Sequence, residues 1–330
     1  MQIESVMTKM ILLITNKEDV TVDFVVRELR HANCEFYRLN TEDIPEFVEI
    51  RFSIDKGNYI IYDKVKSQSI DLNRVSAVYF RRPKISELTY ITGVTLQEKQ
   101  YLQRELATLL EGIYKTLRKA FWINDIYKIR EAENKIYQLQ LAQQIGFEIP
   151  SSAISNNAYL LKDMIESTED NCIIKPVRSG NMGFHDGREV IFTARFKGTQ
   201  INAQERVAAF PIYLQENLDK EYDIRCIVVG EEVFAAAIDS QGNPDAVIDW
   251  RKSKIPLPHE KIQLPTDIQE KAIEITQALG LTYSAIDMVL DRNKNFVFLE
   301  CNPNGQWAWI ETRLGYPISA TIVDLLQNGE

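Results

Sequence analysis

The chain has 330 residues, which at about 150 residues per domain predicts roughly two domains. Its 38 lysines and arginines against 47 aspartates and glutamates give a net charge of −9, which argues against a protein that binds nucleic acid mainly through phosphate neutralisation. No apolar run approaches the roughly 18 residues needed to cross a bilayer, so we expect no membrane span and no membrane partner.

Cysteine and histidine usage excludes several kinds of site. Four cysteines lie apart from one another and form no Cys-x-x-Cys pair, which is typical of buried thiols in a reducing cytoplasm. Only three histidines occur, none near another, which argues against a histidine-based zinc site. The chain also lacks a Gly-x-Ser-x-Gly elbow, a Walker pattern and Gly-x-Gly-x-x-Gly. A bound nucleotide must therefore be held by another route.

The first third of the chain alternates strand and helix signals. An apolar run predicts a strand at 10–15, helical spacing predicts a helix at 20–31, and β-rich segments predict strands at 35–40, 59–62 and 77–80. Alternation of this kind predicts an α/β layer with a mainly parallel sheet.

Two helices and then a region of strands follow. Leucines at helical spacing predict a helix at 96–119, and a second helix is predicted at 129–145, with Gly146 at the C-cap position. The elements predicted beyond residue 151 are strands at 172–176 and 211–217, a hairpin of 224–230 with 232–238, a helix at 266–280, and a hairpin of 284–290 with 296–300. We expect domain boundaries near residues 125 and 218.

The strongest group of chemically active residues is Asp287, Glu300 and Asn302 in the last hairpin. If Asp291 pairs with Phe296 across a four-residue loop, Asp287 stands opposite Glu300, about 5 Å away at Cβ. Asn302 lies two residues on and points to the same face. A hard cation such as Mg²⁺ takes oxygen ligands and would remove the repulsion between the carboxylates. The alternative is an acidic face that is merely solvated, and spacing alone does not decide between them.

This interpretation carries an expectation about stability. If the two carboxylates repel each other in the free protein, Asp287→Asn and Glu300→Gln should remove activity while thermal stability holds or rises. Stabilisation by nucleotide should shrink in both variants.

Lys175 is the second signal, because it ends an Ile-Ile strand where a lysine is costly unless a negative group meets it. Gly180 and Gly183 follow in a segment whose backbone N–H groups are able to close over phosphates. The alternative, a strand-end lysine that reaches solvent before an ordinary loop, is favoured when Lys175 is considered alone. Lys135 is a weaker candidate, since helix lysines are usually solvated.

The third signal is Tyr213-Leu-Gln-Glu-Asn-Leu218. A strand that ends in Glu-Asn-Leu is able to offer backbone groups to an adenine edge, and Asp223 is placed to accept hydrogen bonds from ribose hydroxyls. Each piece alone is common. The order along the chain carries more information: a lysine, a glycine loop, a hinge strand, an acid, an arginine, and then the hairpin with its two acids and asparagine.

In this order, residues of about 129–325 resemble the ATP-grasp superfamily, in which the nucleotide lies between two antiparallel sheets. Four segments are similar to those of the microviridin-type (graspetide) peptide macrocyclases, and they extend the resemblance to nearly the whole chain. These segments are Glu300-Cys-Asn-Pro-Asn-Gly-Gln-Trp-Ala-Trp-Ile-Glu311, Tyr79-Phe-Arg-Arg-Pro83, Asp249-Trp-Arg251 and Leu279-Gly-Leu-Thr-Tyr-Ser-Ala-Ile-Asp287. The chain departs from the family pattern at Cys301 and at Arg313-Leu-Gly315.

The resemblance implies an α/β (α+β) chain with an ATP-grasp fold in three parts. These are an N-terminal α/β pre-ATP-grasp domain at 1–125, a linker helix with a central lid domain at 126–218, and a C-terminal ATP-grasp domain with the Mg²⁺ site at 219–330.

The resemblance also implies roles for single residues. The nucleotide would be held by phosphate-binding, hinge and ribose residues, namely Lys135, Lys175, Gly180, Gly183, Glu216, Asn217, Leu218 and Asp223. The implied Mg²⁺ ligands are Asp287, Glu300 and Asn302. Arg225 would lie near the phosphates, and Arg251 would steady the acyl phosphate or the oxyanion that follows it. Arg81 and Arg82 would hold acidic side chains of a peptide, the alternative being a solvated strand end.

The function implied is that of a ligase using ATP and Mg²⁺. It would activate side-chain carboxylates of a ribosomally made precursor peptide as acyl phosphates and close ester or amide links within that peptide. We expect a cytoplasmic homodimer whose partner is a precursor peptide with a leader and an acidic, hydroxyl-rich core. Two alternatives stay open: a ligase that adds free amino acids to a peptide or protein, and a non-catalytic nucleotide-dependent binding protein. The metal-ligand set argues against the second, because a pure binder has no need of it.

Overall fold

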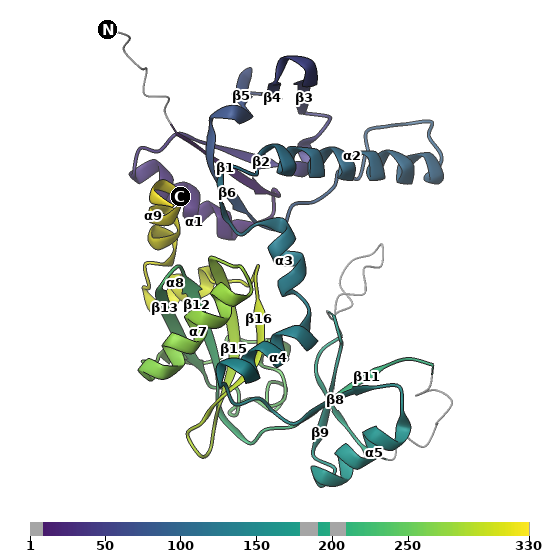
Figure 1. The fold of residues 1–330 in the computed structure, drawn as a ribbon, viewed down its shortest axis with the longest axis vertical. Coiled ribbons are helices and arrows are strands. Elements are labelled where there is room, and N and C mark those ends of the chain that lie inside the picture. Colours follow the sequence, from purple (N-terminus) through teal and green to yellow (C-terminus); the bar gives the residue numbers. More distant parts are fainter. Residues whose placement is uncertain (1–8, 179–190, 199–208, 330) are drawn as a thin grey trace. The chain divides into compact units, whose positions relative to one another are not determined.

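The computed structural model describes residues 9–178, 191–198 and 209–329, and the chain divides into two compact units (Figure 1). Unit 1 contains the described residues up to Ile129 together with Leu281–Tyr283 and the chain from Gln306 onward. Unit 2 contains the described residues of Arg130–Gly280 and Ser284–Gly305. In these described ranges, no helix is long and apolar enough to cross a membrane.

Unit 1 is built around a four-stranded parallel sheet, which confirms the prediction of an α/β layer. The strand order is β2-β1-β6-β7, and every pair is parallel. The strands are β1 (Met10–Thr15), β2 (Phe36–Asn40), β6 (Val75–Phe80) and β7 (Phe121–Ile123). The helices of this unit are α1 (Val20–His31), α2 (Leu96–Thr116), α8 (Ala308–Leu314) and α9 (Ile318–Asn328), and α3 (Ile126–Ala132) begins in unit 1 and ends in unit 2.

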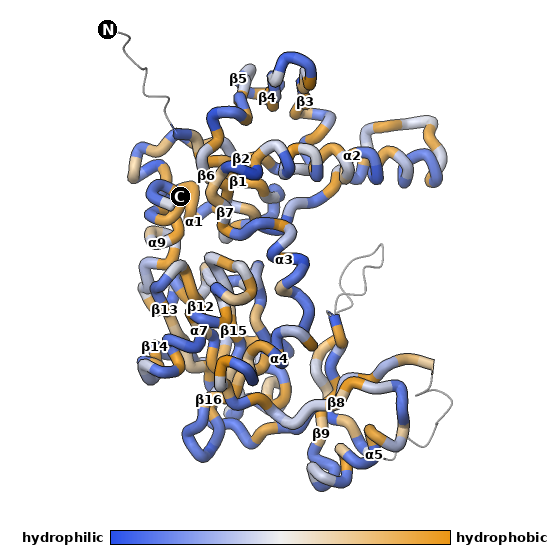
Figure 2. Tube along the Cα trace, in the orientation of Figure 1, coloured by the Kyte–Doolittle hydropathy of each residue, from blue (hydrophilic) through white to orange (hydrophobic). Residues whose placement is uncertain are grey.

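Helix α2 covers one face of this sheet through its C-terminal half. Leu110 and Ile113 are buried in one core with Leu12 and Ile14 of β1. Hydrophilic and hydrophobic residues alternate along α2 in Figure 2, as expected for an amphipathic helix. The opposite side is supported by α1 and α9, which contact each other, while α9 contacts β6 and β7.

Unit 1 also contains a small antiparallel sheet, of which the sequence predicted only the middle strand. Its order is β3-β4-β5, with β3 at Val48–Ser53, β4 at Asn58–Asp63 and β5 at Gln68–Asp71. Strand β5 has four residues and only one buried side chain, Ile70. Its stability comes from pairing with β4, a contact that composition does not reveal.

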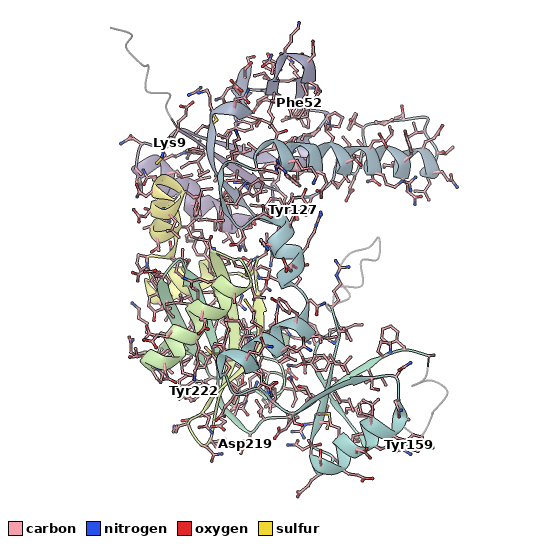
Figure 3. The ribbon with its side chains drawn as sticks, viewed as in Figure 1. Lys9, Phe52, Tyr127, Tyr159, Asp219 and Tyr222 are labelled. Atoms are coloured by element: carbon pink, nitrogen blue, oxygen red, sulfur yellow. The ribbon has the colours of Figure 1, made fainter. Side chains whose placement is uncertain are left out.

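Unit 2 contains two antiparallel sheets. The first, which we call the lid sheet, has the order β10-β9-β11-β8. Its strands are β8 (Ser152–Ser155), β9 (Cys172–Lys175), β10 (Ala194–Phe196) and β11 (Ile212–Glu216). Helix α5 (Ala158–Ser167), which the sequence analysis missed, packs Leu161 and Met164 against this sheet. Its exposed Tyr159 is labelled in Figure 3.

The second sheet of unit 2 has five strands in the order β14-β13-β12-β15-β16. They are β12 (Lys220–Val229), β13 (Glu232–Ile238), β14 (His259–Lys261), β15 (Tyr283–Asp291) and β16 (Phe296–Asn302). Helices α4 (Lys135–Ile145) and α7 (Thr266–Ala278) contact each other, and α4 also contacts β16. Both predicted hairpins are present as β12–β13 and β15–β16.

The single helix predicted at 129–145 is two helices, α3 and α4. The break lies at Asn134, whose side-chain oxygen accepts hydrogen bonds from the N–H groups of Ile136 and Tyr137, each at 3.1 Å. This N-cap makes Lys135 the first residue of α4 rather than a mid-helix residue. The predicted C-cap is confirmed, because Gly146 has a left-handed backbone with φ of 93°.

Candidate active site

A cavity of about 670 Å³ in unit 2 is lined by residues of both antiparallel sheets. The lid sheet contributes Lys175, Gln215 and Glu216, and the five-stranded sheet contributes Asp223, Asp287 and Glu300. Helix α4 adds Lys135 and Gln138. Residues that are distant in the sequence and carry opposite charges therefore line one cavity.

Asp287 and Glu300 are directly opposed on β15 and β16, as the sequence predicts, but the route to this register differs. Leu290, not Asp291, pairs with Phe296, so the hairpin loop is one residue longer than expected. A bulge between Asp287 and Met288, where β16 holds one additional residue, then restores the predicted pairing. The two deviations cancel at the carboxylates.

Each of these carboxylates has a cationic partner. Arg225 Nη1 lies 2.8 Å from Asp287 Oδ1, and Lys135 Nζ lies 3.0 Å from Glu300 Oε2. Arg251 Nη1 is 3.7 Å from the other oxygen of Glu300. Burial opposes ionisation of Glu300, yet the surrounding cations, Lys135 first among them, lower its pKa to about 2. Glu300 therefore remains charged, and each of the two carboxylates has a cationic partner within the protein itself.

Lys135, the weakest candidate by sequence, reaches Glu300 because of its place at the start of α4. Its side chain is only 18% exposed, so the expectation that a helix lysine is solvated is wrong here. The signal was present in the sequence as Asn134, an N-cap residue immediately before it.

The approach of Arg225 to Asp287 depends on a glycine. A Cβ added at Gly305 would lie 2.2 Å from Ala285 Cβ and 2.5 Å from Arg225 Nη2, closer than real contacts allow. Only the absence of a side chain at this position lets the guanidinium pass between the segment after β16 and β15. The Asn-Pro-Asn-Gly segment thus has a steric role beside its chemical one.

The oxygen donors fit Mg²⁺. Asp287 and Glu300 supply carboxylates, and Asn302 supplies an amide oxygen that already accepts a hydrogen bond from the N–H of Asn304 at 3.0 Å. Mg²⁺ is commonly held by one or two carboxylates, with waters and substrate phosphates completing the shell. Among the described residues no three His, Cys, Asp or Glu side chains gather at one point.

Lys175 ends β9 inside the cavity. Its side chain is half-buried and donates a hydrogen bond to Gln215 Oε1 on the neighbouring strand. Burial lowers the pKa of Lys175 to about 8, against the raising effect of nearby Glu300. A lysine held in this way is not the solvent-directed strand end that the sequence alone favoured.

The predicted adenine hinge, Glu216 to Leu218, leaves the end of β11. The N–H of Glu216 donates to Ser151 O at 2.8 Å, and the N–H of Asn217 donates to Asn171 O at 2.9 Å. For Leu218 no backbone hydrogen bond is formed within the described part of the chain, so its N–H and C=O are open to a ligand. Asp219, labelled in Figure 3, follows directly and leads into β12.

Asp223, the predicted ribose acid, is 5% exposed and already engaged. Lys220 Nζ donates to its two oxygens at 2.8 and 2.7 Å, and Ser240 Oγ donates to Oδ2 at 2.6 Å. Burial raises the pKa of Asp223, while Lys220 opposes that effect. A ribose hydroxyl would have to share this carboxylate with a lysine that the sequence analysis did not single out.

Arg251 is oriented by Asp249. Arg251 Nε and Nη2 donate to the two oxygens of Asp249 at 2.8 and 2.9 Å. The same carboxylate accepts the N–H of Thr193 at 3.3 Å, and Lys252 donates to Thr193 O at 2.6 Å. Asp249 therefore links Arg251 to the segment that leads into β10.

Arg81 and Arg82 lie in unit 1 and differ sharply in environment. Arg81 is 2% exposed, with Nε 2.9 Å from Asp19 Oδ2 and Nη2 donating to Gln306 Oε1 at 2.9 Å. Arg82 is exposed and has a left-handed backbone with φ of 48°. A peptide carboxylate would have to displace Asp19 to reach Arg81, whereas Arg82 is accessible.

Gly180 and Gly183 lie outside the described residues. Gln138, Lys220 and Asp249 line the cavity although the sequence analysis assigned no role to them. Lys220 and Asp249 bind the predicted residues Asp223 and Arg251, whereas Gln138 binds backbone groups of Cys301 and Ala132.

Arg81→Met should lower the free energy of unfolding by about 3–5 kcal/mol, because it leaves the buried Asp19 carboxylate without its counter-charge. Arg82→Met removes an exposed side chain and should change the free energy of unfolding by less than about 0.5 kcal/mol. Urea unfolding followed by tryptophan fluorescence measures both. Equal effects of the two substitutions would contradict the structural role of Arg81.

Asp287→Asn and Glu300→Gln should each lower the melting temperature without nucleotide or Mg²⁺, contrary to the expectation from sequence. The first weakens a charge-assisted hydrogen bond of about 1.5–3 kcal/mol, and the second leaves Lys135 and Arg251 facing each other without their carboxylate. Glu232→Gln, at the exposed start of β13, is the control. Thermal melting is followed by circular dichroism. A higher melting temperature in either variant would show that repulsion between the carboxylates is the dominant effect.

Comparisons with known proteins match this geometry. Residues 132–326 match the family model of the RimK-like ATP-grasp domain, and residues 10–130 match that of the MvdD pre-ATP grasp domain. The structure is similar to macrocyclase MdnC from Microcystis aeruginosa MRC, crystallised bound with precursor peptide MdnA. The TM-score is 0.84 at 28% identity, over 97% of this chain and 100% of that chain.

Two further relatives differ in how much they cover. A Chryseobacterium gregarium RiPP-associated ATP-grasp ligase, in complex with ADP and a leader and core peptide, shares the fold with a TM-score of 0.88 at 24% identity, over 98% of this chain and 97% of that one. A probable alpha-L-glutamate ligase from Haemophilus influenzae (strain ATCC 51907 / DSM 11121 / KW20 / Rd) is 26% identical over 216 residues, 63% of this chain and 67% of that protein.

The predicted ATP-grasp fold and the resemblance to microviridin-type macrocyclases are confirmed by these matches. The RimK-like model alone covers more than half of the residues. The chain therefore belongs to the RimK-like ATP-grasp family.

Proposed function

We propose that this ATP-grasp ligase is a macrocyclase of ribosomally made precursor peptides. It activates a side-chain carboxylate of the peptide with ATP and joins it to a hydroxyl or amine of the same peptide. The products are an ester or amide ring, ADP and phosphate. The substrate class follows from the similarity to MdnC, and the reaction type follows from the family and from the charges in the cavity.

The observation that carries this proposal is the extent of the similarity. The match to MdnC covers 97% of this chain, whereas the match to the glutamate ligase covers 63%. Residues 10–130 match a pre-ATP-grasp model of their own. The N-terminal part, in which Arg82 lies exposed, thus supports a peptide substrate over a free amino acid.

The cavity supplies charge where phosphoryl transfer needs it. Lys175 and Arg251 line the cavity and are positioned to stabilise negative charge on the transferred phosphoryl group, and Arg225 adds positive charge from its buried position beside Asp287. A peptide carboxylate attacks the γ-phosphorus and releases ADP, after which a hydroxyl or amine attacks the acyl carbon and releases phosphate. Mg²⁺, held by Asp287, Glu300 and Asn302, would neutralise the phosphates and orient them.

The ion pairs of the free protein suit this role, because they keep the site charged and ordered before the substrates arrive. Lys135 and Arg225 hold the carboxylates that are proposed to bind the metal. With a metal ion bound to these carboxylates, Lys135 and Arg225 would be released from them and could turn toward the phosphates. Arg82 is the proposed contact for acidic peptide side chains, and Arg81 supports it from the buried pair with Asp19.

Two further features belong to the proposal. We place the enzyme in a reducing cytoplasm, because all four cysteines are free thiols and three of them are buried. The homodimer stays a prediction, which light scattering of the purified chain decides.

Incubation with Mg·ATP and the cognate precursor peptide should give a product lighter by one water per bond formed, with ADP released in proportion. No free amino acid should be needed. The tethered nucleophile gains a large effective molarity when it is held next to the acyl phosphate. A heavier product, or dependence on added glutamate, would favour the glutamate-ligase alternative; mass spectrometry distinguishes them.

Lys175→Met should weaken ADP and ATP binding by about 1.5–3 kcal/mol, since it removes a charge-assisted contact while it keeps the length of the side chain. Turnover should fall further, because charge develops on the phosphoryl group during transfer. Lys162→Met, on α5 of the same lid, is the matched control. Isothermal titration calorimetry measures the affinities. If Lys175→Met kept both the affinity and the turnover of the wild type, the assignment of Lys175 to the site would be contradicted.

A further inference from the structure

Strand β16 is an edge strand, yet its open side is covered. No strand of the described chain pairs with it opposite β15. Instead, Phe298 N–H donates to Glu148 O at 2.8 Å, and Glu148 forms an isolated parallel bridge with Val297. Further along the strand the partner is a side chain of α4, which lies beside β16 in Figure 1.

That side chain is Gln138. Cys301 N–H donates to Gln138 Oε1 at 2.9 Å, and Gln138 Nε2 donates to Cys301 O at 2.7 Å. Nε2 also donates to Ala132 O, at the end of α3, at 2.5 Å. Gln138 is 2% exposed, so its amide is desolvated and committed to these bonds. One side-chain amide therefore takes the place of a neighbouring strand and joins α3, α4 and β16.

The residue held in this way lies between two proposed metal ligands. Cys301 separates Glu300 from Asn302, and Gln138 follows Lys135, the partner of Glu300, by three residues on one helix face. The bulge in β16 interrupts the ladder just before Glu300, so this part of the strand has fewer backbone restraints than an ordinary strand. The double hydrogen bond to Cys301 restores them.

We propose that Gln138 is a positioning residue of the metal site. It acts through the backbone of Cys301 and through the helix that carries Lys135, because its amide is committed to backbone groups. This inference rests on the proposed function, in that Glu300 and Asn302 are taken as metal ligands. Groups that orient metal ligands from outside the coordination shell commonly change metal affinity about 10–100-fold when they are replaced.

The test measures binding, with Mn²⁺ and ADP as probes. Gln138→Met keeps the length and removes both hydrogen-bonding groups, and Gln138→Asn keeps both groups but shortens the reach. Gln140→Met, at an exposed position of the same helix, is the matched control. ADP affinity is measured by titration calorimetry in excess EDTA and in excess Mn²⁺, and Mn²⁺ affinity by electron paramagnetic resonance.

We expect Gln138→Met to weaken Mn²⁺ binding about tenfold or more, with ADP affinity in EDTA unchanged. Amide hydrogen exchange at Cys301 should become faster in both variants of Gln138 and stay the same in Gln140→Met. A purely structural role would lower ADP affinity equally with and without metal. If Gln138→Met fails to fold, Gln138→Asn decides by the same comparison.

Two results would overturn the inference, and they differ in meaning. If wild-type protein shows metal-dependent ADP affinity and Gln138→Met retains it fully, Gln138 is not a positioning residue and the proposed metal site stands. If ADP affinity of the wild type is the same in EDTA and in Mn²⁺, the proposed metal site fails together with the inference.

Discussion

Charge balance around Asp287 and Glu300 is the constraint on which the rest of the site depends. Two like charges about 5 Å apart repel by about 3 kcal/mol at an effective dielectric constant of about 20, which is a large fraction of a protein's net stability. The protein offsets this repulsion with cations from three separate elements: β12, the start of α4, and the turn that follows Asp249. Folding of unit 2 and preparation of the site are therefore the same event.

The balance also explains features that have no chemistry of their own. Gly305 leaves room for the guanidinium of Arg225, and Asn134 starts a helix where Lys135 is needed. Asp249 holds Arg251 at both of its oxygens. These residues make no contact that a reaction requires, yet each sets the direction of a charged side chain. A site of this kind is specified by many residues of modest individual effect.

Much of the fold could be predicted from periodicity, and the reasons for the failures are physical. The parallel strands of unit 1 and both hairpins carry patterns long enough to identify. Strand β5 is too short to carry a pattern, and the break at Asn134 was hidden by helical spacing on both sides of it. A cap is a local hydrogen bond, which a count of apolar positions does not detect.

The candidate site also contains features that could be predicted from residue spacing and features that could not. The pairing of Asp287 with Glu300 follows from the period of a strand and could be predicted. The cations could not be assigned to their partners by spacing, because Arg225 is separated from Asp287 by 62 positions and a long side chain has many rotamers. The contact of Gln138 is still harder to predict from sequence. Its partner is a backbone group, which any residue type at position 301 would supply.

The bulge in β16 has a consequence for how this hairpin tolerates changes in length. Because successive strand residues face opposite sides, deletion of Leu299 would regularise the ladder while moving Glu300 and Asn302 out of register with Asp287. The loop between Asp291 and Asn295 is different, because the bonds of Glu148 and Gln138 fix β16 independently of it. Natural insertions, or a fluorophore introduced by design, are therefore expected to be tolerated at the loop and excluded at the bulge.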